Sequence, residues 1–296
     1  MELTLLISLI TYGLVTASYC ALLALGFSVI YRAAGFFNFA HAIVFTLGPY
    51  LALMFSLNLG WSRFASYSTA ILLCSVIGCL IQLCILGPLA RRGAPSLVLL
   101  LASLGVYIVL QNVLSAIFGD ETRLLQSGPV GAGIDIRGIR FSSHHVISVG
   151  VSAAVLGMAF GLWRGTRIGR TIRAVCSDSA LAEITGVPRD RIIMLIFAAA
   201  SATAATAGIL VGLDLGLTPT MGMKVLMMAA VAVIVGGVGS IPGVGLGSLL
   251  LGVAQYLAIW RVDSRWQDTI AFAILLLFLV FRPQGFLGQP LKETAV

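Results

Sequence analysis

Apolar residues along the chain form solid blocks separated by short polar stretches. Blocks such as 192–213 and 270–281 contain no charged side chain. A helix needs about 20 apolar residues to cross a bilayer, and solid blocks favour such helices over the alternating strands of a membrane barrel. The pattern predicts spans near residues 5–30, 42–58, 65–88, 96–118, 146–163, 192–213, 224–236, 243–260 and 269–281.

The composition supports the same fold class. The 296 residues are 59% hydrophobic and 10% charged, whereas soluble domains average about 45–50% and about 25%. Tryptophan prefers the membrane–water interface, and all four tryptophans fall at or just outside the predicted span ends. We therefore predict one all-α, polytopic membrane domain over residues 1–296, with about eight to ten transmembrane helices, some broken or re-entrant.

The charges predict which loops lie inside the cell. The connection 164–191 carries six arginines against three acidic residues, and a shorter loop carries Arg91 and Arg92. Basic loops stay in the cytoplasm, so both are predicted to be cytoplasmic in a multi-pass bacterial inner-membrane protein. Counting spans then places 119–145 outside the cytoplasm. The side of the N-terminus stays open, because the region around Asn38 can be a re-entrant break.

Two shorter patterns predict local structure. The stretch 134–141 alternates around a central glycine, which favours a small hairpin in the extracytoplasmic loop. Glycines spaced by four residues predict close helix packing in the second half of the chain. These glycines are Gly208, Gly212 and Gly216, and Gly239, Gly243 and Gly247.

The sequence holds no motif for catalysis or nucleotide binding. The glycine-rich stretch 236–243 has Pro242 where a dinucleotide fingerprint needs glycine, and no G-x-x-x-x-G-K-[ST] occurs. This stretch indicates a break between two helices, with Pro242 opening the second. Adjacent His144 and His145 would lie on different helix faces, which disfavours a metal site. We expect a chain that is no enzyme, holds no cofactor or metal and binds no nucleic acid.

Polar residues at membrane depth are few and are candidates for function. Asn38 and His41 coincide with the clearest helix break, and irregular backbone at that depth is tolerated only inside protein or beside water. Gln111 and Asn112 lie late in the fourth predicted span. We expect these four residues to line a translocation path. The remaining amides, Gln82 and Gln255, are expected to form hydrogen bonds between helices.

Several motifs resemble the branched-chain amino acid ABC permeases of the LivH type. Three segments of this chain are similar to the family's amino-terminal signature: Gly26-Phe-Ser-Val-Ile-Tyr31, Asn38-Phe-Ala-His41 and Leu47-Gly-Pro-Tyr50. Later blocks are similar to Gly169-Arg-Thr-Ile-Arg-Ala174, Val235-Gly-Gly-Val-Gly-Ser-Ile-Pro-Gly243 and Phe281-Arg-Pro-Gln-Gly-Phe-Leu-Gly288, and Leu110-Gln-Asn112 fits the fourth span. The motifs cover nearly the whole chain in the family's order.

The resemblance implies one subunit of an ATP-driven importer. Its partners would be a second homologous permease, two cytoplasmic ATPase subunits that bind ATP and Mg, and a substrate-binding protein. Such permeases dock on the ATPase through a segment near E-A-A-x-x-x-G, and 180–186 fits this spacing with alanine in place of the glutamate. The residues expected to couple to the ATPase are Arg173, Asp178, Ala180, Ala182, Glu183 and Gly186.

The cargo is less defined than the family. The family commonly follows N-F-A-H with glycine and an acidic residue, whereas this chain has Ala42 and Ile43. Branched-chain or other small neutral amino acids are the first expectation, and urea or short amides are the alternative. An ion-coupled carrier or channel is a different class of protein. Ion-coupled carriers generally need carboxylates within the membrane, and we expect Asp214, at a predicted span end, to be the only acidic residue near a span. This disfavours ion coupling.

Overall fold

The computed structural model describes residues 2–125, 134–136, 139–141, 143–261, 263–282 and 284–288, and it is almost entirely helical. The helices are α1 (Glu2–Ala34), α2 (Ala40–Asn58), α3 (Arg63–Ile81), α4 (Gly87–Arg91), α5 (Ser96–Phe118), α6 (Ser143–Gly165), α7 (Arg167–Ser177), α8 (Ser179–Ile184), α9 (Arg189–Leu215), α10 (Met221–Gly236), α11 (Ile241–Ile259) and α12 (Gln267–Phe281). A π-helical turn, Gln82–Leu86, joins α3 to α4, and a 3-10 turn, Ser264–Trp266, precedes α12.

The predicted fold class is confirmed. Within the described residues, eight helical segments are long and apolar enough to cross a membrane, and α10 is a shorter apolar helix of 16 residues. The predicted hairpin is also present, because β1 (Ile134–Ile136) and β2 (Ile139–Phe141) pair antiparallel. The predicted break at 236–243 separates α10 from α11, and Pro242 lies in the first turn of α11.

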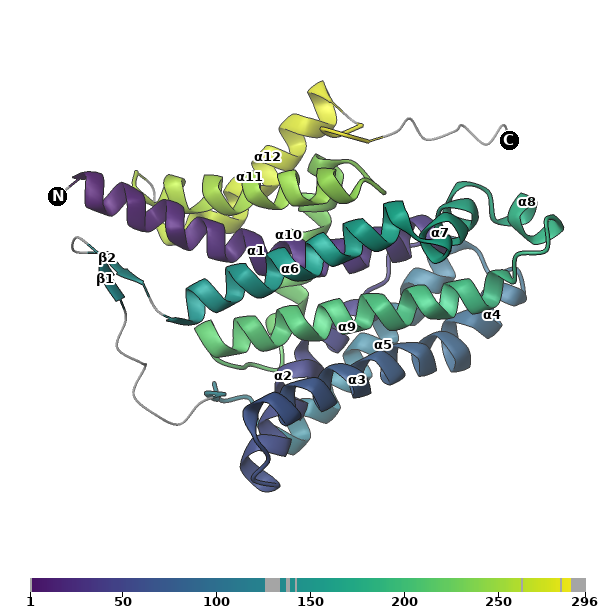
Figure 1. The fold of residues 1–296 in the computed structure, drawn as a ribbon, viewed down its shortest axis with the longest axis horizontal. Helices are drawn as coiled ribbons and strands as arrows, with labels where there is room; N and C mark the ends of the chain where they lie inside the picture. Colours follow the sequence, from purple (N-terminus) through teal and green to yellow (C-terminus); the bar gives the residue numbers. More distant parts are fainter. Residues whose placement is uncertain are drawn as a thin grey trace.

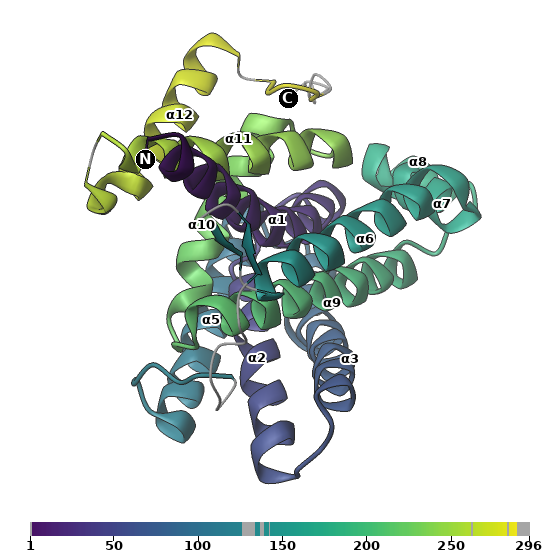
Figure 2. The same cartoon turned by 60° about the vertical axis from the view of Figure 1, so that its left-hand side comes forward.

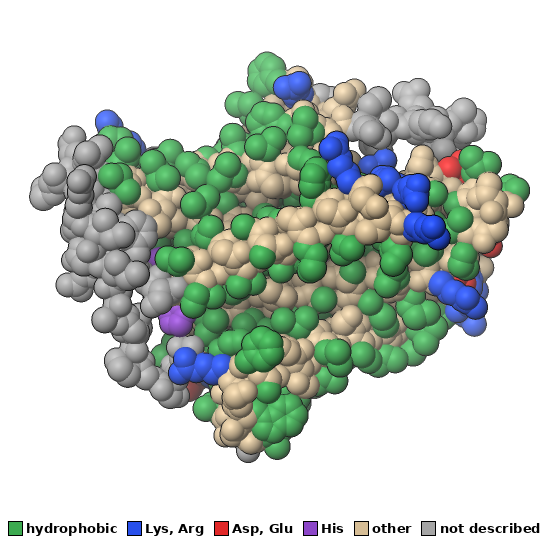
Figure 3. Space-filling model, in the orientation of Figure 1, with side chains coloured by type: hydrophobic (Ala, Val, Ile, Leu, Met, Phe, Trp, Pro, Cys, Tyr) green, Lys and Arg blue, Asp and Glu red, His purple; other side chains and the backbone are tan. Residues whose placement is uncertain are grey.

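The molecule has two chemically different ends. The N-terminus and the β1–β2 hairpin lie together on the left in Figure 1, and we call this the hairpin end. Helices α4, α7 and α8 lie on the right, and we call this the basic end. Figure 3 shows most of the visible Lys and Arg side chains at the basic end, with hydrophobic side chains along the middle. An apolar belt between polar ends is the surface that a membrane requires.

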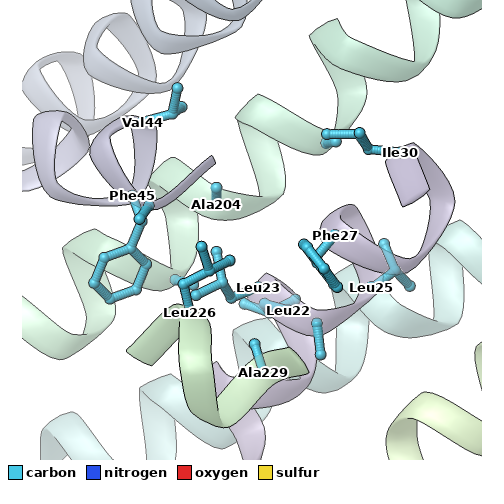
Figure 4. Close-up of a cluster of buried hydrophobic side chains, with 14 of the residues drawn as sticks. Leu22, Leu23, Leu25, Phe27, Ile30, Val44, Phe45, Ala204, Leu226 and Ala229 are labelled. Carbon is cyan, nitrogen blue, oxygen red and sulfur yellow. The ribbon is translucent and has the colours of Figure 1, made fainter. Parts of the chain in front are cut away.

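Helix α1 lies in the middle of the bundle. It packs mainly against α11 on one side and α9 on the other, with α10 and α6 also in contact (Figures 1 and 2). Helices α2 and α3 cover another side of α9, while α5 packs mainly on α2, and α12 on α11 and α10. The core is apolar where α1, α2 and α10 meet, with Leu22, Leu23, Phe45 and Leu226 fully buried (Figure 4).

Glycines permit the close approach of these helices. A Cβ atom on Gly208 of α9 would overlap the carbonyl oxygen of Phe45 in α2. On the other side of the bundle, a Cβ atom on Gly247 of α11 would overlap the carbonyl oxygen of Ala232 in α10. The prediction that these spaced glycines lie at helix contacts is therefore confirmed for both helix pairs.

Three distant segments meet in a junction near the basic end. In α1, the Ser28 hydroxyl accepts the N–H of Gly239 at 3.1 Å, and the Arg32 guanidinium donates to the Gly239 carbonyl at 3.2 Å. From the C-terminal turn 284–288, the N–H groups of Phe286 and Leu287 donate to the last carbonyls of α10 at 2.9 and 3.0 Å. These bonds satisfy backbone groups that the break after α10 leaves without helical partners.

We expect Gly208→Leu to disrupt the bundle, because the added side chain must push α2 away from α9. Overpacking of this kind costs about 1–3 kcal/mol, and more where backbone cannot move. The control is Gly157→Leu on α6, where a Cβ atom would meet nothing within 4 Å. Membrane yield and melting temperature in detergent should fall for Gly208→Leu and stay near wild type for Gly157→Leu. Equal values for the two variants would contradict the packing.

Candidate functional site

The predicted break between α1 and α2 is present and well bonded. Gly35, with φ of +76°, follows α1, and α2 begins at Ala40. The Asn38 side-chain oxygen accepts the N–H of Ala40 at 3.1 Å, so this amide fixes the first turn of α2. Ser103 of α5 accepts the N–H of Phe39 at 3.0 Å. The break therefore lies inside protein, as irregular backbone at membrane depth must.

Asn38 and His41 lie side by side in a closed region. Their exposed fractions are 2% and 1%. Both line a space of only about 10 Å³ between α1, α2, α3 and α9. That volume is at the lower limit for one water molecule. Within the described residues, His41 Nε2 has no hydrogen-bond partner, and it lies against Gly26 of α1, where a Cβ atom would be 2.9 Å from it.

Gln111 and Asn112 are far along α5 and face a different environment. The buried side of α5 carries Ser103, Tyr107 and Leu114. Asn112 follows Ser103 by nine residues, which is half a turn out of phase on a helix, so it lies on the opposite side. Asn112 is exposed, with its amide donating to the Ile108 carbonyl at 2.7 Å, and Gln111 is half-buried. The structure thus brings Asn38 and His41 together but not this second pair.

Most of the predicted coupling residues lie in or beside the short helix α8 at the basic end, and Arg173 lies in the preceding helix α7. Asp178 is the N-cap of α8, because its carboxylate accepts the N–H groups of Ala180 and Leu181 at 3.1 and 3.0 Å. Gly186, with φ of +88°, follows the end of α8. This is the left-handed conformation that glycine commonly supplies after a helix. The segment expected to contact the ATPase is therefore a short helix that ends at a glycine.

The outer surface of α8 is apolar. Leu181 is 60% exposed and Ile184 is 83% exposed. Ala180 and Glu183 are exposed as well, and only Ala182 of the predicted set is buried. Large exposed apolar side chains on a helix at the end of the bundle are typical of a surface that contacts another protein.

Helix α7 packs between α8 and the helix bundle. Its Thr166 N-cap accepts the N–H of Gly169 at 3.0 Å. Val175 is buried, Arg173 is half-buried, and burial raises the pKa of the Cys176 thiol from 9.0 to about 11, partly offset by the nearby Arg32. The thiol stays protonated at neutral pH, consistent with a packed inner face of α7.

A largely buried contact between a histidine and a carboxylate joins α6 to α9 at the hairpin end. His145 Nε2 lies 3.1 Å from Asp214 Oδ1, with side-chain exposed fractions of 9% and 19%. Tyr12 of α1 packs edge-on against the His145 ring, with ring centroids 5.2 Å apart. The carboxylate of Asp214 is therefore engaged in a contact between helices.

Sequence reasoning missed a cavity at the hairpin end. It has a volume of about 420 Å³ and lies between α1, α9, α10, α11 and the start of α12. An ion pair between Lys224 and Asp268 lies at its edge. Asp268 is in the first turn of α12, so the view that only Asp214 is an acidic residue near a span was wrong. One signal was visible beforehand, since Lys224 is one of two lysines and opens a predicted span.

Comparison with known proteins gives a consistent result. The family model "Branched-chain amino acid transport system / permease component" matches residues 9–279. The high-affinity branched-chain amino acid transport system permease protein LivH of Escherichia coli (strain K12) is 32% identical over 295 residues, covering 95% of each chain. BraD of Pseudomonas aeruginosa, a permease protein with the same description, is also 32% identical over 295 residues with 95% coverage of each chain. A solved structure, PsaBC from Streptococcus pneumoniae in complex with Fab, has a TM-score of 0.49 at 17% identity, covering 92% of this chain and 91% of that chain.

We expect Asn38→Ala to lower the melting temperature, because it removes the acceptor for the Ala40 N–H at the start of α2. Leaving a buried donor without its acceptor costs about 1–3 kcal/mol. Asn38→Ser is the matched control, since its hydroxyl can still accept an N–H in the first turn. Thermal unfolding in detergent should rank wild type and Asn38→Ser above Asn38→Ala. An unchanged melting temperature in Asn38→Ala would show that the hydrogen bond is not structural.

Proposed function

The chain belongs to the family of branched-chain amino acid transport permease components, and on that premise we propose that it forms the membrane path of an ATP-driven importer for branched-chain or other small neutral amino acids. It is a multi-pass inner-membrane protein. The observation that carries the proposal is the likeness to LivH over 95% of both chains, which leaves no large part of the chain for another activity.

The importer would need several further subunits. A soluble substrate-binding protein would deliver the cargo at the hairpin end, and a second homologous permease would complete the path. Two ATPase subunits at the basic end would bind ATP and Mg. This orientation follows from the arginines of α7 and of the α4–α5 connection, since basic residues mark the cytoplasmic side.

Helix α8 is the proposed contact with the ATPase. Its exposed Leu181 and Ile184 provide an apolar surface, while Asp178 and Gly186 fix the two ends of the helix. Arg173 and the rest of α7 connect this surface to the bundle through α6, α1 and α9. A movement of the ATPase would therefore reach the centre of the bundle through packed helices.

The proposed translocation path passes the exposed side of α5. A polar side chain at membrane depth normally faces protein or water rather than lipid. Asn112 is exposed, and its amide bonds only to the Ile108 carbonyl of its own helix within the described chain. A second permease beside this face would give Asn112 and Gln111 such surroundings. Asn38 and His41 would join the path only when the space beside them widens, because it is now about 10 Å³.

ATP hydrolysis should require the partner subunits. In liposomes, the chain alone should hydrolyse no ATP, because its sequence has no phosphate-binding lysine motif. The chain purified with its ATPase subunits should hydrolyse ATP, and binding protein loaded with leucine should stimulate it and drive uptake. Stimulation by urea-loaded or amide-loaded binding protein instead would move the cargo to the alternative class. Hydrolysis by the chain alone would overturn the proposal.

Ile184→Asp should weaken ATPase docking, because it places a charge in the apolar surface of α8. Truncating or charging a central interface side chain costs about 2 kcal/mol or more, which is more than tenfold in affinity. Leu124→Asp is the control, since Leu124 is 69% exposed at the opposite, hairpin end. Pull-down of the ATPase should fall only for Ile184→Asp, with melting temperatures unchanged in both. Normal docking of Ile184→Asp would remove α8 from the interface.

A further inference from the structure

The cavity at the hairpin end has the size and shape of a small-molecule site. Its volume of about 420 Å³ falls within the range of about 300–1,000 Å³ that is usual for ligand pockets. It opens beside the first turns of α10 and α12 and extends inward between α1, α10 and α11. Neither the proposed path along α5 nor the α8 surface uses it.

One opposite-charge pair marks the mouth of this cavity. Lys224 Nζ lies 3.3 Å from Asp268 Oδ2, and the two side chains are 67% and 47% exposed. An exposed pair of this kind contributes little to stability. Charged side chains within membrane-spanning segments are uncommon and usually serve a function. Lys224 is also the sole lysine among the described residues.

The interior of the cavity is mainly apolar. Val225 and Met228 of α10, Val211 of α9 and Leu251 of α11 line it. The main amide there is Gln255, which is 4% exposed and donates to the Gln267 carbonyl at 3.1 Å. That bond holds α11 against the backbone of the residue that precedes Asp268.

We propose that this cavity binds one free amino acid with an aliphatic side chain, its carboxylate on Lys224, its ammonium on Asp268 and its side chain against the apolar wall. The zwitterion replaces one contact between the two protein charges with two contacts of its own, and no net charge is buried. The site rests on the proposed function and adds to it a place in the permease where the cargo binds after delivery at the hairpin end.

The same geometry selects against related molecules. Urea and simple carboxamides offer neither a carboxylate for Lys224 nor an ammonium for Asp268, and leucinamide keeps the ammonium but lacks the carboxylate. A free carboxylic acid engages Lys224 but leaves Asp268 facing an apolar group. Ligands with both charges and a branched tail therefore bind best, and a short tail leaves part of the apolar wall uncovered.

The test is equilibrium binding of radiolabelled leucine to the full chain in nanodiscs made only of phosphatidylglycerol, so that no zwitterionic lipid competes. Wild type should bind with one saturable site. Lys224→Met and Asp268→Asn should each weaken binding about tenfold or more, because each removes a charged hydrogen-bond partner. Isoleucine and valine should displace leucine, while leucinamide and 4-methylpentanoate should compete at least about tenfold less well.

Three further variants separate binding from folding. Arg265→Met removes a cation at the same end but outside the cavity and should bind leucine like wild type. Thr220→Trp should block the mouth without changing any charge, and Thr220 makes no side-chain cap bond that would be lost. The exchange Lys224→Asp with Asp268→Lys should recover part of the binding. Melting temperatures identify any variant that fails to fold. If a charge variant fails to fold, leucine binding to Thr220→Trp decides whether the cavity is the binding site.

Each remaining outcome has a defined meaning. Leucine binding that is equal in wild type, Lys224→Met and Thr220→Trp would overturn the site, as would no binding to wild type. Displacement by dihexanoyl phosphatidylethanolamine but not by isoleucine would assign the cavity to a lipid headgroup and overturn it as well. Leucine uptake by the assembled transporter that is unchanged in Lys224→Met and Thr220→Trp would reject the site and leave the proposed function intact. Absence of uptake by the wild-type transporter would instead reject the proposed function.

Discussion

Hydrogen bonding of the backbone in a medium without water is the constraint on which this structure depends. Each helix satisfies its own backbone groups, so a helix can stop at membrane depth only where other protein groups take over. The break before α2 meets this condition through Asn38 and Ser103. The break after α10 meets it through Ser28, Arg32 and the 284–288 turn. Both breaks are thereby fixed to neighbouring helices rather than free in lipid.

The same constraint divides the polar residues of the membrane segments into two groups. Asn38 and Gln255 bond to backbone groups of the protein and are buried, so their present contacts are structural. Asn112 and Lys224 are exposed, and no packing role in the described chain accounts for their place on the surface. Exposed polar residues such as Asn112 and Lys224 indicate where other molecules contact the helix bundle. In this protein they lie on α5 and at the edge of the hairpin-end cavity.

Close packing connects these sites to the proposed ATPase contact. Glycines bring α2 against α9 and α10 against α11 at backbone distance, so these helices move together or not at all. Helix α1 contacts α6, α7, α9, α10 and α11, and it links α7 at the basic end with the cavity at the hairpin end. A rotation of α7 and α8 would therefore change the contacts of α1 along most of its length. Coupled helices of this kind suit a transporter that opens its two sides in turn.

The sequence by itself determined the fold class, most spans, the hairpin and the helix breaks. These features depend on local residue order: the length of apolar blocks and the φ preference of glycine and proline. Only the tertiary structure decided that Asn38 and His41 are enclosed, that Asn112 faces outward, and that Lys224 and Asp268 meet at a cavity. These positions depend on which helix faces meet across long stretches of sequence, such as the 44 positions from Lys224 to Asp268. Apolar membrane helices are hydrophobic on every side, so their sequence pattern does not reveal which face turns inward.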